Sequence, residues 1–203
     1  MKMFRIEICG GIASGKTTLA NLLSPAIGQV VLEDFSNNPF WRAFYADPNN
    51  TAFETEITFL LQHYHQIKMA NLQGESFACD FSPLLDYVYA HVTLSGSRFD
   101  TFKNVYSEAC SHLAPPTLLV YLRCDPAVEL ERIHARGRDV EASITVDYLA
   151  ALNGRLDSLV ASLPAAQAVL PLDSVHYDFA RDEQAKAEVV KLVADRLTAL
   201  ARN

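Results

Sequence analysis

The stretch Ile8-Cys9-Gly10-Gly11-Ile12-Ala13-Ser14-Gly15-Lys16-Thr17-Thr18 decides the fold of this chain. Gly10, four further residues, and then Gly15, Lys16 and Thr17 fill every fixed position of the Walker A pattern. An apolar run over residues 4–9 precedes it, and helix-forming residues 19–23 follow it. The stretch therefore predicts a phosphate-binding loop (P-loop) between a β-strand and an α-helix.

The residue types of this loop suit the phosphates of a nucleotide. Glycines let successive backbone N–H groups turn inward around phosphate oxygens, at a helix N-terminus whose dipole also favours anions. We expect Lys16 to reach the β- and γ-phosphates and the Thr17 hydroxyl to coordinate Mg²⁺. The predicted nucleotide-binding residues are Gly10, Gly11, Ile12, Ala13, Ser14, Gly15, Lys16, Thr17 and Thr18.

Short apolar runs with β-forming residues recur along the chain and are separated by longer stretches of helical periodicity. They lie at 4–9, 30–32, 76–79, 118–122 and 168–172. This alternation predicts an α/β fold, in which a five-stranded parallel sheet has helices on both faces. The 203 residues contain no repeat and no composition change typical of a domain boundary, so we expect a single domain over 1–203.

Composition narrows the class of partner. Half of the residues are apolar, which is enough for a sizeable core, and the net charge of −7 argues against a nucleic acid or a membrane surface as partner. No segment is apolar and long enough to cross a bilayer, and the first predicted strand begins too early to leave room for a signal peptide. The four cysteines show no metal-ligand or redox spacing. We expect a cytoplasmic protein with reduced thiols.

Acidic residues follow two of the predicted strands, where ligands of parallel sheets bind. Glu33 could accept a proton from a hydroxyl that attacks the γ-phosphate, and a solvated loop acid is the alternative. Asp80 has the position of a Walker B aspartate that holds Mg²⁺, and a helix cap is the alternative. The predicted metal ligands are thus Thr17 and Asp80.

Three arginines, Arg132, Arg136 and Arg138, follow the fourth strand. Two of them lie four residues apart, on one face of a predicted helix over 126–136, where like charges repel unless an anion neutralises them. This favours a lid over phosphates at about 132–145. An exposed basic helix end is the alternative.

A third group of polar residues lies on or near otherwise apolar helices. Glu56 and His63 are two helical turns apart and share a face, and Asp86 follows Asp80 by six residues. For His63 alone, a position at the rim of the core is the more ordinary interpretation. As a set, the three would suit the hydrogen-bonding edge of a nucleobase.

Taken in order, these motifs resemble the deoxynucleoside kinases, especially their bacterial deoxyguanosine/deoxyadenosine kinase branch. The resemblance covers most of the chain. It is carried by the P-loop, Glu33 to Asn38-Pro39-Phe40 with Phe44-Tyr45, Asp80-Phe81-Ser82, the lid Arg132-Ile-x-x-Arg136-Gly-Arg138-x-x-Glu141, and Asp147-Tyr148-Leu149 through Asn153. It implies a P-loop kinase fold, ATP with Mg²⁺, a deoxynucleoside as acceptor, and a homodimer.

The resemblance also implies roles for individual residues. Glu33 matches the general base that takes the proton of the sugar 5′-hydroxyl, and Tyr45 and Glu141 match the pair that holds the 3′-hydroxyl. Glu56 and Asp86 match the two base-reading positions. The catalytic set it implies is Glu33 and Lys16 with the three lid arginines, Arg132, Arg136 and Arg138, which embrace the donor phosphates.

Two positions depart from the family pattern. The family's triplet is an acid, Arg, and then Ser or Thr, whereas this chain has Phe81 in place of the arginine that steadies the catalytic acid and the transferring phosphoryl group. His63 stands where the family has an arginine that works with Asp86 on the base. Arg42 and Arg98 are the candidates to supply the missing charge.

The primary hypothesis is a kinase that transfers the γ-phosphate of ATP to the 5′-hydroxyl of a deoxynucleoside. One alternative is a nucleoside monophosphate kinase such as a thymidylate kinase, which would need an arginine near the third strand for the acceptor phosphate. Another is a nucleotide-binding regulatory protein that has lost catalysis together with that arginine. Glu56 favours purines weakly, since its carboxylate accepts hydrogen bonds from amino or imino groups.

Overall fold

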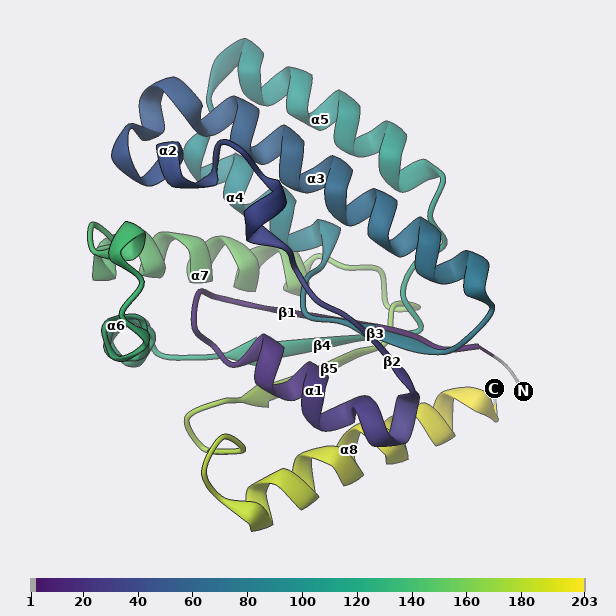
Figure 1. The fold of residues 1–203 in the computed structure, drawn as a ribbon. Coiled ribbons are helices and arrows are strands. Elements are labelled where there is room, and N and C mark those ends of the chain that lie inside the picture. The colour runs from purple at the N-terminus through teal and green to yellow at the C-terminus, as the bar shows by residue number, and fades with distance from the viewer. Residues whose placement is uncertain (1–2, 203) are drawn as a thin grey trace.

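The computed structural model describes residues 3–202 and has one five-stranded, all-parallel sheet (Figure 1). Its strands are β1 (Arg5–Gly10), β2 (Gln29–Val31), β3 (Phe77–Cys79), β4 (Leu118–Arg123) and β5 (Val169–Asp173), in the order β2-β3-β1-β4-β5. Each strand begins and ends within one residue of a predicted apolar run. The predicted α/β fold is therefore confirmed.

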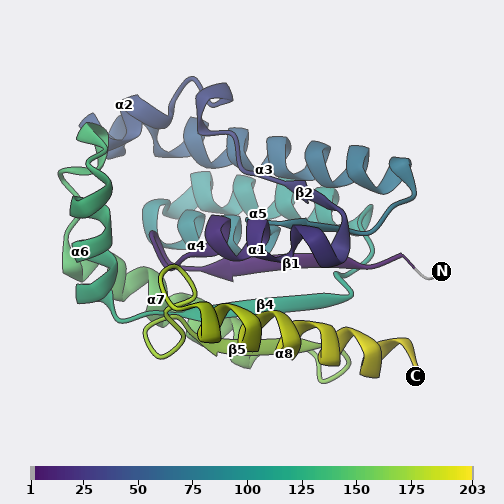
Figure 2. The same cartoon turned by 60° about the horizontal axis from the view of Figure 1, so that its bottom comes forward.

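In the part of the chain that the structure describes, eight α-helices connect and cover the strands. They are α1 (Lys16–Ile27), α2 (Trp41–Ala46), α3 (Pro48–Gln73), α4 (Pro83–Thr93), α5 (Gly96–Ser111), α6 (Pro126–Arg136), α7 (Val146–Ala161) and α8 (Glu183–Ala201), with the short 3₁₀ turns η1 (Phe35–Asn37) and η2 (Asp139–Glu141). The sheet separates α1 and α8 from α4 and α7, and α3 and α5 pack outside α4 (Figure 1 and Figure 2). Within residues 3–202, no helix combines the length and apolarity that crossing a membrane requires.

The hydrophobic core has one layer on each face of the sheet. Alternate residues of β1 point to opposite faces, so Ile6 and Ile8 pack with α1 and α8, while Cys9 packs with α4 and α7. All six residues of β1 are buried. Two of them, Arg5 and Glu7, are charged, and they form a buried ion pair with Arg5 Nε 3.1 Å from Glu7 Oε1.

Helices α2 and α4 were not predicted from the sequence. Helix α4 starts with a recognisable signal, because Ser82 caps it by accepting a hydrogen bond from the Leu84 N–H (3.3 Å) and Pro83 occupies its first turn. Its residues are apolar on most sides, so it lacks the polar face of a surface helix. Helix α4 matters for the site because it packs against α3 and carries Asp86.

Candidate active site

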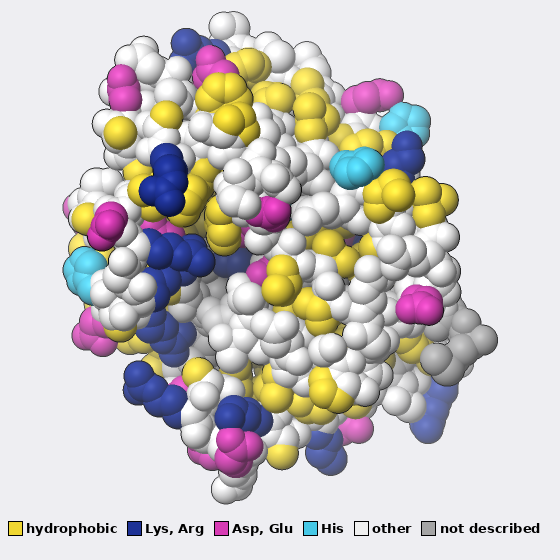
Figure 3. Space-filling view, viewed as in Figure 1, with side chains coloured by type: hydrophobic (Ala, Val, Ile, Leu, Met, Phe, Trp, Pro, Cys, Tyr) yellow, Lys and Arg dark blue, Asp and Glu magenta, His cyan; other side chains and the backbone are white. Residues whose placement is uncertain are grey.

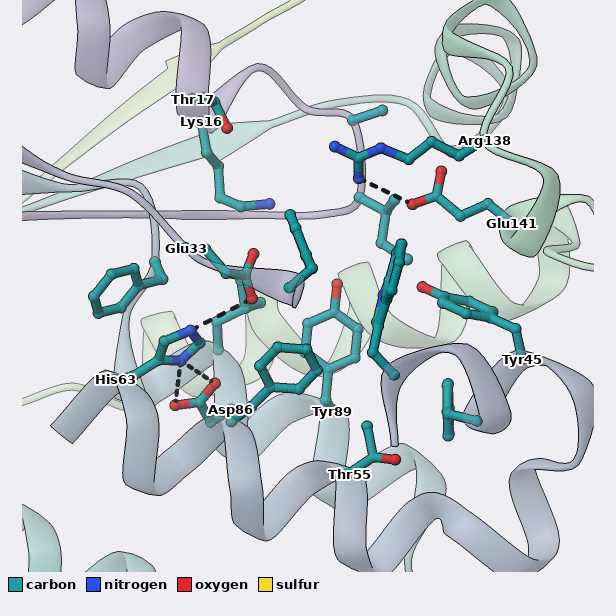
Figure 4. Close-up of a pocket in the computed structure, with 18 of the residues that line it drawn as sticks. Lys16, Thr17, Glu33, Tyr45, Thr55, His63, Asp86, Tyr89, Arg138 and Glu141 are labelled. Atoms are coloured by element: carbon teal, nitrogen blue, oxygen red, sulfur yellow. Dashed lines mark hydrogen bonds and ion pairs between the residues drawn. The ribbon is translucent and has the colours of Figure 1, made fainter. Parts of the chain in front are cut away.

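A pocket of about 400 Å³ lies at the carboxyl ends of β1, β2 and β3. Side chains from the P-loop, the segment after β2, α3, α4 and the region after α6 point into it (Figure 4). Lys and Arg side chains gather around a hollow on this face, beside α6 (Figure 3). The predicted residues that line the pocket are Ile12, Ala13, Gly15, Lys16, Thr17, Thr18, Glu33, Tyr45, Glu56, His63, Asp86, Arg132, Arg136, Arg138 and Glu141.

Four predicted residues contact this lining without belonging to it, namely Gly10, Gly11, Ser14 and Asp80. The backbone carbonyls of Gly10 and Gly11 accept hydrogen bonds from the Lys16 ammonium, at 3.1 and 2.9 Å. Burial lowers the pKa of Lys16, although the Glu33 and Asp80 carboxylates oppose this shift. The lysine is thus held against its own loop.

Two glycines of the loop are required by geometry. Gly15 begins α1 with a φ of 104°, a left-handed conformation that glycine adopts without strain. A Cβ on Gly10 would lie 2.7 Å from the backbone oxygen of Leu122 on β4. The loop therefore packs closely on the sheet while its N–H groups remain available at the helix N-terminus.

The two predicted metal ligands lie side by side. The Thr17 hydroxyl donates to Asp80 Oδ2 (2.6 Å), and the Glu33 N–H donates to Asp80 Oδ1 (2.6 Å). Asp80 thereby joins the start of α1 to the segment after β2. A hydroxyl oxygen and a carboxylate at the mouth of a phosphate-binding loop are donors that fit Mg²⁺.

His63 and Asp86 form a buried pair between α3 and α4. His63 Nδ1 donates to both oxygens of Asp86, at 2.9 and 3.0 Å, while His63 Nε2 lies 3.4 Å from Glu33 Oε1 (Figure 4). Burial by itself would lower the pKa of His63, but the Asp86 and Glu33 carboxylates outweigh it and raise that pKa to about 10. The imidazole is therefore charged at neutral pH.

Phe81, the residue at the departure from the family triplet, is buried against this pair. Its ring lies 4.1 Å from the His63 ring with an interplanar angle of 12°, so the two are stacked. Arg42 lies over the Trp41 ring, and Arg98 donates to the Asn49 carbonyl. Neither arginine is among the lining residues of the pocket in the described chain, so in this structure His63 is the cation next to Glu33 on the side of Phe81.

Glu56 lies deeper in the pocket wall, with 4% of its surface exposed. Its Oε1 accepts a hydrogen bond from the Thr93 hydroxyl (3.0 Å). Burial raises the pKa of Glu56 to about 8, although the Thr93 hydrogen bond opposes the shift. At neutral pH this carboxyl is mostly protonated, so it can donate a hydrogen bond to a ligand as well as accept one.

The region after α6 is organised around Glu141, which is 2% exposed. Arg136 donates to Glu141 Oε2 from Nε (2.7 Å), and Arg138 Nη1 lies 3.3 Å from Glu141 Oε1. The Arg138 guanidinium also lies 5.0 Å from the centre of the Phe35 ring. Burial raises the pKa of the Tyr45 phenol, and the nearby Glu141 carboxylate adds to this shift.

Arg132 binds different groups from those that Arg136 and Arg138 bind. Its guanidinium donates to the Ser174 hydroxyl (3.1 Å) and the Ser174 carbonyl (2.8 Å), and it lies 3.4 Å from the Ala13 carbonyl of the P-loop. It therefore joins α6 to the P-loop and to the segment after β5.

Sequence reasoning missed several residues that line the pocket, most of them aromatic. They are Phe35, Trp41, Phe44, Thr55, Phe59, Phe81, Leu85 and Tyr89. Their spacing follows no single helical or strand period because they come from η1, α2, α3 and α4 and the segment after β3. The density of aromatic residues between 35 and 59 was the available signal. Such walls suit a flat, partly apolar ligand.

Comparison with known proteins identifies the family. A family model described as deoxynucleoside kinase matches residues 6–198. The chain belongs to the deoxynucleoside kinase family. It is thus an ATP-dependent phosphotransferase with a deoxynucleoside as acceptor, and the resemblance inferred from the motifs is confirmed.

Two curated relatives come from Bacillus subtilis (strain 168). Its deoxyguanosine kinase is 29% identical over 182 residues, which cover 86% of this chain and 88% of the relative. Its deoxyadenosine/deoxycytidine kinase is 27% identical over 198 residues, which cover 93% and 91%. Among solved structures, the deoxyadenosine kinase from M. mycoides with bound dCTP superposes with a TM-score of 0.81 at 21% identity, over 97% of this chain and 100% of that chain. This last likeness supports the fold.

Proposed function

We propose that Glu33 is the general base of this kinase and deprotonates the 5′-hydroxyl of a deoxynucleoside for in-line attack on the γ-phosphate of ATP. The observation that carries the proposal is the place of Glu33. Its backbone is tied to Asp80 beside Thr17, and its carboxylate faces the pocket 3.4 Å from His63 Nε2. It thus lies between the phosphate-binding loop and the wall that carries Glu56 and Asp86. General bases of this kind must lie within hydrogen-bond reach of the reacting hydroxyl.

The donor half of the site would consist of the P-loop and the lid. Residues 10–18 would hold the phosphates of ATP, and Mg²⁺ held by Thr17 and Asp80 would neutralise charge on them. Lys16, Arg132, Arg136 and Arg138 would stabilise the charge of the transferring group, since phosphoryl transfer depends mainly on positioning and electrostatics. Closure of the segment at about 132–145 over the phosphates would exclude water from the reaction.

The acceptor half would lie between α3, α4 and η2. Tyr45 and the buried Glu141 would bind the sugar 3′-hydroxyl, while Glu56 and the His63–Asp86 pair would form the polar edge of the base site. The aromatic rings of Phe35 and Phe59 would pack against the ligand. A pocket volume of about 400 Å³ suits a ligand of nucleoside size.

We propose a purine deoxynucleoside as the preferred acceptor. One Bacillus subtilis relative is named deoxyguanosine kinase and the other deoxyadenosine/deoxycytidine kinase, so a purine deoxynucleoside stands in both names. A protonated Glu56 can pair with an acceptor and a donor on a purine edge at once.

We also propose that the chain acts as a single P-loop kinase domain, forms a homodimer and works in the cytoplasm. Support for the dimer comes from Leu61, Met69 and Leu72, which lie on one face of α3 with 47%, 46% and 73% of their surfaces exposed. Support for a reducing compartment comes from the four free cysteines, of which Cys9 and Cys79 are buried.

The proposal is tested by an assay of ADP release with MgATP and each of the four deoxynucleosides or their monophosphates. We expect turnover with at least one deoxynucleoside and not with its monophosphate. Glu33→Gln should lower kcat by at least about 100-fold without weakening ATP binding, whereas Glu54→Gln, an exposed position on α3, should have no effect. ATP binding without ADP release for any acceptor would instead support a nucleotide-binding protein that lacks catalysis.

A further inference from the structure

His63 lies where two carboxylates from different elements converge. Asp86 on α4 presents both oxygens to Nδ1, and Glu33 after β2 presents Oε1 to Nε2 (Figure 4). The side chains of His63 and Asp86 are 3% and 6% exposed, and that of Glu33 is 18% exposed. A neutral imidazole would turn a lone pair toward one of these carboxylates, away from water. Nε2 forms no hydrogen bond, but two carboxylates that face the two ring nitrogens favour an imidazole that carries a proton on both.

Packing holds the ring in this orientation independently of the charges. Phe81 stacks on the imidazole at 4.1 Å, and the Phe59 ring lies 5.8 Å away at an interplanar angle of 25°. A ring held in this way cannot turn its edge toward the pocket without losing these contacts. Nδ1 donates to Asp86, and Nε2 lies within ion-pair distance of Glu33 without forming a hydrogen bond, so both ring nitrogens of His63 face protein carboxylates.

The charges around the pair explain why a cation is needed here. On the acceptor side of the pocket the Asp86 carboxylate lies near Glu33, and Asp80 accepts a hydrogen bond from the Glu33 N–H. Glu56 is mostly protonated, and the Lys16 ammonium donates to the P-loop carbonyls. Neighbouring carboxylates repel one another, and a cation beside them offsets this repulsion. In this structure, His63 is that cation for Glu33 on the acceptor side.

We propose that His63 is a positioning residue for phosphoryl transfer: its imidazolium, held by Asp86 and Phe81, holds the Glu33 carboxylate in the orientation that accepts the proton of the 5′-hydroxyl. This inference rests on the proposed role of Glu33 as general base. Asp86 acts on the reaction through His63, and its remaining lone pairs stay available to a base. The base site and the catalytic carboxylate are thus joined by one buried chain, Asp86–His63–Glu33.

The test compares His63→Asn and His63→Gln with His65→Asn, an exposed histidine on the same helix. For each variant, kcat and KM for the preferred deoxynucleoside are measured at saturating MgATP, together with the thermal unfolding midpoint and the nucleoside Kd in the presence of a non-hydrolysable ATP analogue. General base catalysis contributes about 10²- to 10⁴-fold, so loss of its positioning should lower kcat by about 10- to 100-fold. We expect this for His63→Asn, with the nucleoside Kd changed less than about 3-fold.

His63→Gln separates positioning from structure. The amide nitrogen of Gln reaches nearly as far as Nε2 and can donate to Glu33, whereas that of Asn reaches only as far as Nδ1. A positioning role predicts that His63→Gln retains more kcat than His63→Asn, at similar unfolding midpoints. Equal loss in both variants would overturn the inference, and so would a loss that follows the unfolding midpoint or appears in the nucleoside Kd alone.

A double variant keeps this inference distinct from the proposed role of Glu33. If His63 acts through Glu33, His63→Asn should have no further effect on kcat in the Glu33→Gln background. A Glu33→Gln variant with normal kcat would refute the base assignment. An inactive Glu33→Gln variant together with a fully active His63→Asn variant would refute only the role of His63.

Discussion

Replacement of Glu56 by Gln should change the pH dependence of stability in a way that follows from burial of this carboxyl. The pKa of Glu56 is about 8 in the folded protein, against 4.5 for an unperturbed Glu. Because the folded pKa is raised, the protonated form stabilises the fold at low pH, and this contribution is lost as the pH rises from about 4.5 through 8. The Gln side chain cannot ionise and loses nothing over this range.

The expected magnitude follows from these two values. Between pH 5.5 and pH 9 the linkage relation gives a loss of about 3 kcal/mol for this one group in the wild-type protein. The other buried acids, such as Glu129 with a pKa of about 7, are present in both proteins and cancel in the difference. The free energy of unfolding of Glu56→Gln relative to wild type should therefore rise by about 3 kcal/mol over the same range.

Urea denaturation without ligands at pH 5.5, 7 and 9 measures this difference, with Glu54→Gln as the exposed control on the same helix. The control should show the same pH dependence as the wild-type protein. A stability difference between Glu56→Gln and wild type that is constant from pH 5.5 to pH 9 would refute the argument, because Glu56 would then ionise in the folded protein as it does in water.

Two further substitutions test other parts of the site. Gly11→Ala would place a Cβ in overlap with Glu129 Oε1 and 2.5 Å from Asn153 Oδ1, two side chains that are hydrogen-bonded to each other, so the P-loop or this pair must shift. The Kd for MgATP should rise by at least about 10-fold in a calorimetric titration, that is about 1.4 kcal/mol. The control is Gly154→Ala on α7, where an added Cβ would meet nothing within 4 Å, and it should stabilise the protein by about 0.5–1 kcal/mol. An unchanged Kd for Gly11→Ala would contradict this prediction, because it would show that the P-loop accommodates a Cβ at residue 11 without loss of ATP binding. Glu141→Gln removes the negative charge that Arg136 and Arg138 share. The KM for the deoxynucleoside should therefore rise by about 10-fold, or about 1.4 kcal/mol, while the Kd for ATP stays within about 2-fold. A rise in the Kd for ATP with an unchanged KM for the deoxynucleoside would assign Glu141 to the donor site instead.

Much of the fold could be predicted because local patterns determine it. The P-loop has a fixed spacing, and a parallel sheet brings the carboxyl ends of its strands to one edge. Glu33 and Asp80 were therefore placed near Thr17 from their positions after strands, and the structure joins all three through two hydrogen bonds.

The rest depends on packing between elements that no local pattern records. The His63–Asp86 contact requires α3 to pack against α4, and α4 was missed because its mostly apolar surface lacks the periodicity of a surface helix. The same absence of long-range information left His63 predicted only as one of three residues at the base edge, without its contact to Glu33, and Arg132 as one of three equivalent lid arginines. In the structure, Arg132 binds Ser174, which lies 42 residues away in the chain.

The central claim, that Glu33 is the base for transfer from ATP to a deoxynucleoside, is tested most directly in a single turnover with γ-³²P-labelled ATP and excess enzyme saturated with the acceptor. For the wild-type protein we predict that the label appears in a 5′-monophosphate. For Glu33→Gln we predict the same product at a rate at least about 100-fold lower, with ATP and nucleoside still bound. Transfer by Glu33→Gln at the wild-type rate would contradict the account, and so would label that appears only as inorganic phosphate from the wild-type enzyme.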